Sequence, residues 1–173
     1  ANIVKKVNKE VAAIIGINPA ARTTCVKPSG NASVLLQTAS GIHAEHSPMY
    51  IRNIQMNKES EITQAIAKTN PFMVEESVWS ANGTDLVVSF PIVPKNGSMF
   101  KDDLYGVKHL EMVKKAQKNW VVEGTNEELC ADEGIRHNVS NTIIVDDWDD
   151  VEKYVFENRY SFSGISFLSP TGD

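Results

Sequence analysis

The end of the chain carries the pattern that most restricts its fold, a strand–helix–strand sequence from Val139 to Leu168. Val139–Val145 is rich in β-branched residues, Asp149–Tyr160 has apolar residues at helical spacing, and Phe162–Leu168 is a second apolar run. Two strands joined by a helix of this length form a unit in which the strands are parallel and the crossover is right-handed. The pattern predicts an α/β fold.

Helical and strand-like patterns also alternate before this unit. Ile3–Ile15, followed by Gly16, and Val107–Val122 both carry an apolar stripe at helical spacing. The other expected elements are a β-favouring run at Arg22–Val26, a buried helix from about Asn31, strands at Tyr50–Met56 and Leu86–Phe90, and a helix from Ser60 to Ala67. The second of these strands is expected to end at Pro91. Strands separated by helices over the whole length predict a mostly parallel arrangement.

Composition narrows the class of protein. A chain of 173 residues with 42% hydrophobic and 23% charged residues has the size and composition of one globular domain. Its net charge of −5 argues against a protein that binds the nucleic-acid backbone, which needs a basic face. A nucleotide ligand stays compatible with this charge, because a few backbone N–H groups can hold phosphates. No apolar run approaches the ~18 residues of a membrane span, so a membrane is not an expected partner. Because of the net charge, direct binding of nucleic acid is not expected either.

The two cysteines and the chain ends indicate the cellular environment of the protein and the extent of its full chain. Cys25 and Cys130 lie far apart in the sequence, with neither a disulfide framework nor metal-type spacing, which favours a reducing, cytoplasmic environment. Cys25 is expected to be a buried structural thiol, because it lies in a strand-like run. The chain starts with Ala1 and ends with Thr171-Gly172-Asp173, so we expect residues 1–173 to be a single segment of a longer chain.

The segment Lys27-Pro28-Ser29-Gly30-Asn31-Ala32-Ser33 is the most informative for function. Pro28 stiffens the exit from the preceding strand, and Gly30 permits backbone angles or a close approach that a Cβ would block. A helix starting near Asn31 would direct free N–H groups into the loop, an arrangement that suits nucleotide phosphates. The alternative is a plain strand-to-helix turn in which Ser29 is only an N-cap. The loop is not a P-loop, because the GxxxxGK[ST] spacing is absent.

This loop also carries a resemblance to a known family. Arg22 to Leu36 reads Arg-Thr-Thr-Cys-Val-Lys-Pro-Ser-Gly-Asn-Ala-Ser-Val-Leu-Leu, and Ser40-Gly41-Ile42-His43 follows it. The sequence resembles the class II, adenosylcobalamin-dependent ribonucleotide reductases. Three later stretches fit the same family in the same order, namely Tyr50-Ile51-Arg52, Arg136-His137-Asn138-Val139-Ser140-Asn141-Thr142 and Gly164-Ile165-Ser166-Phe167-Leu168. The likeness runs from about residue 20 to 170 and is vague between 70 and 132.

The resemblance implies a fold, a reaction and a site. It implies that residues 1–173 are the carboxy-terminal part of the catalytic domain, a partial segment of a ten-stranded α/β barrel. The family reduces the 2′-hydroxyl of a ribonucleotide, in this class usually a triphosphate, with a cysteine thiyl radical generated through adenosylcobalamin. The Pro-Ser-Gly loop of the family wraps the substrate phosphates, which makes the expected phosphate contacts Ser29, Gly30, Asn31, Ala32 and Ser33. Asn31 stands where many members have Thr, so an amide replaces a hydroxyl there.

The chain departs from the family in its cysteines. The radical cysteine of the family lies in an Asn-x-Cys-x-Glu sequence, which is absent here, as is the carboxy-terminal cysteine pair. We therefore expect this chain alone to be inactive, with no catalytic residue and no assigned cofactor contact. Its expected partners are the ribonucleoside triphosphate and either the missing amino-terminal part or a second copy. The alternatives are a nucleotide- or anion-binding module and a subunit that completes a partner's barrel, both without activity of their own.

Three further groups of polar residues have ordinary explanations. His43 and His46 flank Glu45, but a zinc site usually needs three or four protein ligands, so we expect loop residues and no metal. The acidic run at 146–150 fits the negatively charged start of the following helix better than a calcium site. Arg136 and His137 precede a strand, and they either face a nucleotide or the cofactor or have a surface or interface role.

Overall fold

The structure, a computed structural model, describes residues 1–170 apart from the side chain of Asn31. Its helices and strands are, in chain order, α1 (Asn2–Ile15), α2 (Asn31–Leu36), β1 (Tyr50–Asn57), α3 (Glu61–Thr69), β2 (Val74–Glu76), β3 (Asp85–Ile92), α4 (Gly106–Ala116), β4 (Thr142–Ile144), α5 (Trp148–Glu157) and β5 (Ser166–Leu168). The predicted mixture of helices and strands is confirmed. The chain divides into two compact units, one made of residues 1–44 with those from 99 onward, the other of residues 45–98. The sheet β1–β3–β2 lies in the smaller unit and the pair β4–β5 in the larger.

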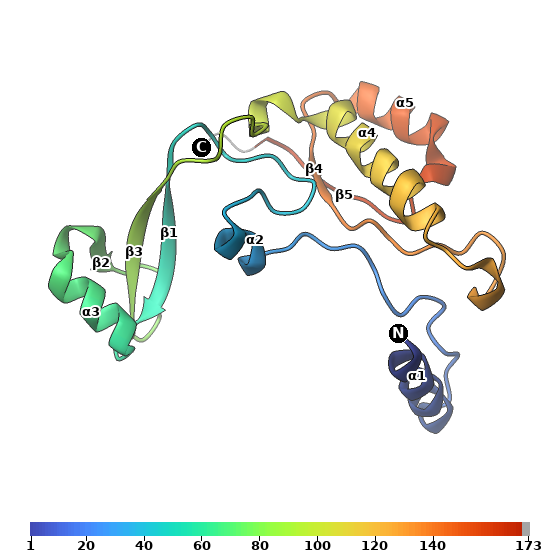
Figure 1. Ribbon diagram of the computed structural model, residues 1–173, viewed down its shortest axis with the longest axis horizontal. Helices are drawn as coiled ribbons and strands as arrows, with labels where there is room; N and C mark the ends of the chain where they lie inside the picture. The colour runs from blue at the N-terminus through green and yellow to red at the C-terminus, as the bar shows by residue number, and fades with distance from the viewer. Residues whose placement is uncertain (171–173) are drawn as a thin grey trace. The chain divides into compact units, whose positions relative to one another are not determined.

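In the larger unit, β4, α5 and β5 form the predicted strand–helix–strand motif (Figure 1). The two strands are parallel, with Ile143 of β4 opposite Phe167 of β5. Helix α5 begins where Oδ1 of Asp147 accepts the amide N–H groups of Asp149 and Asp150, at 3.0 and 3.1 Å. A side-chain cap of this kind stabilises a helix by about 1 kcal/mol. The acidic run at 146–150 thus serves the start of a helix, as the sequence indicated.

The core of the larger unit forms between these strands and the helices α4 and α5, which lie side by side. Leu110 and Val113 of α4, Ile143 of β4 and Val151 of α5 are at most 3% exposed. Burying one such side chain contributes about 1.5–3 kcal/mol. This cluster is therefore the main source of stability in the unit.

Helix α4 begins at Gly106, a position that leaves no space for a side chain. Its φ is +46°, and a Cβ there would lie 2.3 Å from Oδ1 of Asp146 and 3.4 Å from Cγ2 of Val151. The close approach lets α4 start directly against the end of β4 and the first turns of α5. A π-helical turn, Gln117–Val122, follows α4, so helical structure spans the predicted 107–122.

The first two helices match the prediction in position but not in packing. Helix α1 ends at Gly16 with φ +74°, as predicted, and buries Ala12. Helix α2 begins at Asn31, but its predicted burial is wrong, because Leu35 and Leu36 are 85% and 66% exposed. Six residues make fewer than two helical turns, so only one side can face the protein, and that side presents the buried Ser33.

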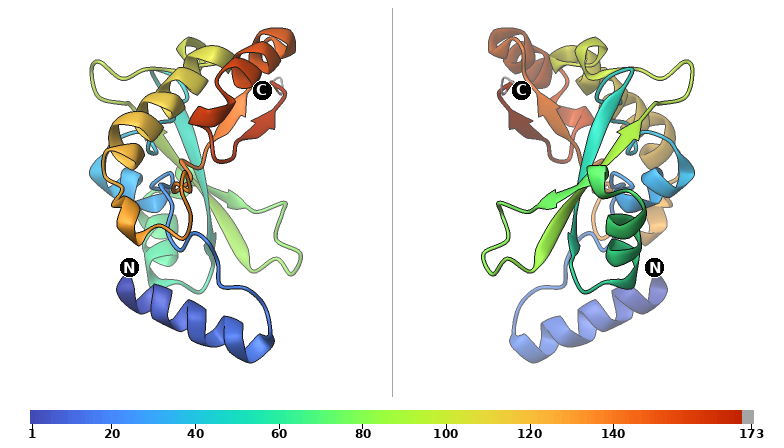
Figure 2. Two further views of the ribbon diagram at one scale, coloured as in Figure 1. Left: turned by 90° about the vertical axis from the view of Figure 1, so that its right-hand side faces the viewer. Right: turned by 90° about the vertical axis from the view of Figure 1, so that its left-hand side faces the viewer.

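The smaller unit corrects the prediction of mostly parallel strands. β3 lies between β1 and β2 and is antiparallel to both, with Tyr50 opposite Ile92 and Val74 opposite Val88 (Figure 2). The connection between β2 and β3 spans only residues 77–84, whereas a parallel crossover needs about a dozen or more. Alternating helix and strand patterns therefore misled the prediction, because α3 joins two strands that are not neighbours in the sheet.

Pro91 does not end the strand, as the sequence suggested, but lies within β3 opposite Ile51. Beyond Val88, β3 has no partner from β2, so it pairs on one side only. A missing N–H is tolerated where one edge of a strand is unpaired. Among residues 1–170, no helix combines the length and the apolar character that crossing a membrane requires.

Candidate functional site

The candidate phosphate loop follows a single parallel bridge between two segments that are distant in sequence. The amide of Val26 donates to the carbonyl of Asn138 at 2.8 Å, and the amide of Ser140 donates to the carbonyl of Val26 at 2.9 Å. The predicted strand at Arg22–Val26 is thus reduced to one paired residue, Val26, which lies opposite Val139. Residues 27–33 leave this bridge at its carboxyl end, where ligands bind in open α/β sheets.

Gly30 has a backbone conformation that a side chain would strain. Its φ is +53° and its ψ is −124°, a combination that non-glycine residues rarely adopt. A Cβ at Gly30 would meet no atom within 4 Å, so the restriction lies in the backbone and not in crowding. The turn before α2 therefore depends on glycine, as the sequence indicated.

Three of the predicted phosphate contacts already use their amides within the loops. The amide of Gly30 donates to Oγ of Ser40 at 3.2 Å, that of Ala32 to the carbonyl of Ser29 at 3.2 Å, and that of Ser33 to the carbonyl of Gly30 at 3.3 Å. The hydroxyl of Ser33, which is 4% exposed, also donates to the Gly30 carbonyl, at 2.5 Å. Ser33 thus stabilises the turn from inside, and its hydroxyl does not face solvent.

The exposed rim of the loop is more suitable for an anion. Ser29 is exposed, and neither its amide nor its hydroxyl has a hydrogen-bond partner among the described residues. The side chain of Asn31, another predicted contact, lies outside the described part of the chain. Lys27, also exposed, donates from Nζ to Oγ of Ser140 at 3.0 Å. This places a positive charge at the entrance of the loop, since no carboxylate in residues 1–170 pairs with it.

A second turn, Ser40–His43, supports the first. Gly41 has φ +66°, and a Cβ there would lie 3.2 Å from Cα of Pro28, so the two turns pack backbone against backbone. The turn is closed by its own hydrogen bonds, because the amide of His43 donates to the Ser40 carbonyl at 3.2 Å and Nδ1 of His43 lies 2.9 Å from the same oxygen. Through its hydroxyl, Ser40 holds the amide of Gly30.

A buried histidine of α4, His109, packs against His43 of this turn. It is 4% exposed, and its ring meets the ring of His43 edge-on, with centroids 5.3 Å apart and an interplanar angle of 78°. Burial first, and the charge of His43 after it, lower the pKa of His109 to about 4. The nearby polar groups of Asn141 and of the Ile42 backbone oppose this shift without reversing it. His109 is therefore uncharged at neutral pH.

Sequence reasoning placed the loop but missed most of its supports. Ser40 stood in a quoted motif, yet its bond to Gly30 joins residues ten apart and has no local signature. Lys27 directly precedes Pro28, and this adjacency could have indicated that its positive charge lies at the loop. For His109 and Asn141 the sequence offers no signal, because their proximity arises only when α4 packs beside the segment before β4.

A cleft of about 920 Å³ opens elsewhere in the larger unit, between α1, residues 19–26 and residues 119–137. Lys5, Arg22 and both cysteines line it. Cys25 is exposed, which corrects the expectation of a buried thiol. The reason is that, among residues 1–170, Arg22–Cys25 pairs with no strand and so does not lie inside a sheet.

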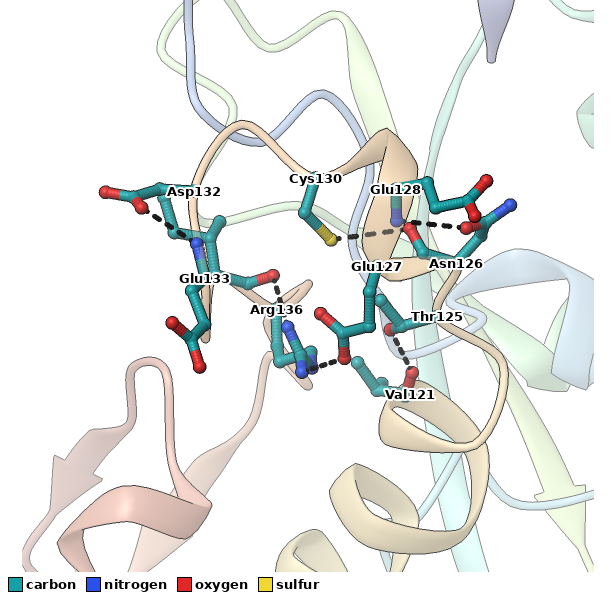
Figure 3. A network of polar contacts seen from close by, with 10 residues as sticks. Val121, Thr125, Asn126, Glu127, Glu128, Cys130, Asp132, Glu133 and Arg136 are labelled. Carbon is teal, nitrogen blue, oxygen red and sulfur yellow. Dashed lines mark hydrogen bonds and ion pairs between the residues drawn. The ribbon is translucent and has the colours of Figure 1, made fainter.

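The wall of the cleft formed by residues 121–136 is held by its own polar contacts (Figure 3). The guanidinium of Arg136 forms an ion pair with Glu127 and donates to the carbonyl of Ile135 at 3.1 Å. The thiol of Cys130 donates to the carbonyl of Asn126 at 3.6 Å. Of the two readings that the sequence left open for Arg136, the structure supports a role in ordering this surface loop.

The other histidines have separate partners. Nδ1 of His137 lies 2.7 Å from the carbonyl of Thr24, and the ring of His46 meets that of Tyr50 at 5.5 Å in the smaller unit. His43 instead packs against the buried imidazole of α4. Within the described residues, no group of three or more His, Cys, Asp or Glu side chains is arranged to hold a metal ion.

The chain matches no family model. It is 29% identical over 106 residues to the probable adenosylcobalamin-dependent ribonucleoside-triphosphate reductase of Dictyostelium discoideum, with 61% of this chain and 14% of that protein covered. It is 24% identical over 155 residues to the adenosylcobalamin-dependent ribonucleoside-triphosphate reductase of Euglena gracilis, with 88% of this chain and 19% of that protein covered. The chain thus spans less than a fifth of the length of either relative.

The fold is also similar to that of a solved protein. The crystal structure of a B12-dependent, class II ribonucleotide reductase superposes with a TM-score of 0.60 at 18% sequence identity, over 99% of this chain and 22% of the other. The similarity expected from the quoted motifs is therefore confirmed. In sequence and in fold, this chain resembles one segment of the class II, adenosylcobalamin-dependent ribonucleotide reductases.

Proposed function

We propose that this chain is part of an adenosylcobalamin-dependent ribonucleoside-triphosphate reductase and supplies the loop that binds the substrate phosphates. The observation that carries the proposal is the position of residues 27–33, at the carboxyl end of the Val26–Val139 bridge, with the positive charge of Lys27 at the rim. Ligands of α/β proteins bind outside the carboxyl ends of strands. The residues of the proposed phosphate site are Ser29, Gly30, Asn31, Ala32 and Ser33.

These five residues would contribute unequally. Ser29 offers its amide and hydroxyl directly, and Lys27 adds charge without belonging to the five. The Ser40 hydroxyl holds the Gly30 amide in the direction of the loop rim, and a phosphate oxygen would share that amide N–H with it in a bifurcated hydrogen bond. The amides of Ala32 and Ser33 already donate within the loop and would act by holding its shape. Helix α2 has only six residues, so the proposal does not depend on its dipole.

The reaction itself would need more than this chain. Adenosylcobalamin would supply the radical, and in the described residues we assign no cobalamin contact and no catalytic residue. Neither cysteine stands in an Asn-x-Cys-x-Glu sequence, and the thiol of Cys130 donates a hydrogen bond to the carbonyl of Asn126 within a surface loop. We therefore propose that the chain is one segment of a ten-stranded α/β barrel and is inactive alone. The activity would serve deoxyribonucleotide synthesis in the cytoplasm.

A second candidate function is that of a subunit that only completes a partner's barrel. The apolar side chains along α1 favour it, since Ile3 and Ile14 are 80% and 82% exposed in this chain. An apolar stripe of this kind is stabilised when another surface covers it. In this case the loop would bind no nucleotide, or would bind a simple anion without reduction.

Titration with a ribonucleoside triphosphate tests the proposal. We expect saturable amide shifts at Ser29 and Gly30 in NMR spectra, and a Gly30→Asp variant should bind at least about tenfold more weakly, because it adds strain and a negative charge. Gly134→Asp is the matched control, since Gly134 also has a positive φ, +74°, and open space around it. Equal affinity of the Gly30→Asp variant and the wild type would overturn the phosphate-loop assignment.

A further inference from the structure

The buried histidine of α4 lies between the two segments that hold the phosphate loop. One segment is the turn Ser40–His43, whose Ser40 accepts the amide of Gly30. The other is residues 139–141, whose Ser140 accepts Nζ of Lys27. His109 meets the first through the His43 ring, and the side chain of Asn141, in the second, is close enough to affect the pKa of His109. One side chain thus lies next to both supports of the loop.

The polar atoms of this contact are buried and incompletely paired. His109 and Asn141 are 4% and 6% exposed. Nε2 of His109 and Oδ1 of Asn141 have no hydrogen-bond partner within the described part of the chain. A buried polar atom without a partner is costly, so an apolar pair at these two positions would pack at lower free energy unless the polar pair has another use.

The contact is made by an uncharged ring. His109 is neutral at pH 7, so its ring meets His43 edge-on without repulsion between two charges. An edge-to-face contact between a buried imidazole and a second ring restricts the angle between the two rings. It therefore fixes the orientation of the His43 ring more tightly than an aliphatic side chain would. The turn at 40–43 is therefore held in one orientation relative to α4.

We propose that His109, which lies between the turn 40–43 and Asn141, is a positioning residue for the phosphate loop. It orders the turn 40–43, and through Ser40 it fixes the direction of the Gly30 amide. It also orders residues 139–141, and through Ser140 it fixes the ammonium group of Lys27. This inference rests on the proposed function for its meaning, but its structural part, the link from His109 to Gly30, can be tested without any nucleotide.

The test compares full chains carrying His109→Leu, His109→Gln and Val151→Ala. Leucine keeps apolar volume and removes the ring nitrogens, and glutamine restores a polar nitrogen. Val151→Ala truncates the same core on α5, at a residue that belongs to neither support. Two quantities are measured in each, the hydrogen-exchange rate of the Gly30 amide and the affinity for a ribonucleoside triphosphate. Melting temperature is recorded for comparison.

We expect His109→Leu to speed exchange of the Gly30 amide and to weaken triphosphate binding by about three- to tenfold, the effect of losing one polar anchor. His109→Gln should recover part of both. Val151→Ala should lower the melting temperature at least as much while leaving both quantities near their wild-type values. If His109→Leu fails to fold, Asn141→Ala takes its place with the same expectation.

The inference is overturned if His109→Leu changes Gly30 exchange no more than Val151→Ala does. It is also overturned if glutamine and leucine at position 109 behave alike, because a purely space-filling role would give that result. Wild-type chain that binds no triphosphate contradicts the proposed function instead. In that case the exchange of the Gly30 amide still decides whether His109 positions the loop.

Discussion

Helices α4 and α1 have similar apolar stripes and very different surroundings. Helix α4 buries His109, Leu110 and Val113, whereas in α1 Ala12 is buried and Ile3 and Ile14 are largely exposed. An apolar stripe predicts that a helix forms and that one face needs cover. It does not identify what covers that face. The chain spans 14% and 19% of its two curated relatives, so a longer protein of that kind would contain other surfaces for α1.

Truncating the buried stripe should give the largest difference between the two helices. Leu110→Ala should lower the free energy of unfolding by about 2–5 kcal/mol, because it leaves a cavity in a packed core. Ile14→Ala, at a position 82% exposed, should change it by less than about 0.5 kcal/mol. Urea unfolding of both variants measures this. Equal losses would show that α1 is covered in solution.

The buried face of α4 should also make stability depend on pH. The pKa of His109 is lowered from 6.5 to about 4, so between these values the unfolded chain binds a proton that the folded chain does not. Stability from this group is complete above pH 6.5 and is lost as the pH falls towards 4, by roughly 3 kcal/mol in total.

Unfolding of wild type and His109→Leu at several pH values isolates this contribution. The difference in unfolding free energy between the two should change by most of that amount between pH 7 and pH 4. His43 is the neighbouring titratable group, so His43→Leu serves as the second variant. A constant difference across this range would contradict burial of a neutral imidazole.

The exposed stripe of α1 should act between molecules. We expect the wild-type chain to self-associate, because apolar side chains along a helix face gain by covering one another. Val11→Lys should raise the dissociation constant by about tenfold, an effect of ~1.4 kcal/mol. Lys9→Gln, on the polar face, should leave it unchanged. Sedimentation equilibrium measures both, and a wild-type monomer at all concentrations would oppose the expectation.

The polar face of α1 should contribute least. Lys6 and Glu10 are one turn apart with 3.8 Å between Nζ and Oε1, and both side chains are more than half exposed. Solvent screens such a pair, so Glu10→Gln should change the free energy of unfolding by less than about 0.5 kcal/mol. Thermal unfolding at low and high salt measures it. A larger, salt-sensitive loss would mean that the pair is less exposed than it is here.

Local patterns predicted the elements better than their arrangement. The stripes of α1, α4 and α5 and the strand–helix–strand motif at the end of the chain are signals within 15 to 30 residues, and the structure contains them all. The order β1–β3–β2 depends instead on which strand enters the sheet between two others, a choice that no local pattern carries. The prediction that Leu35 is buried was wrong for a similar reason. The length of α2 decides how many of its sides can be covered by the rest of the protein.

The candidate site also has features that local sequence predicts and features that it does not. Gly30 was predictable because its backbone angles require glycine, and Ser29 because it stands beside it in a loop between a strand and a helix. The bond from Gly30 to Ser40 and the contact of His109 with Asn141 were not predictable, because each depends on how segments distant in sequence pack. The resemblance to a known family located the loop but offered no account of these supports.

The placement of the two cysteines makes the cleft unusually easy to observe. Cys25 and Cys130 are the whole thiol content of the chain, and both line the same hollow, one on residues 19–26 and one on the loop opposite. A pair of spin labels or fluorophores attached to the native protein would therefore span this opening with no residue replaced. Any segment that enters the space, from this protein or another, would register as a change in the separation of the two probes.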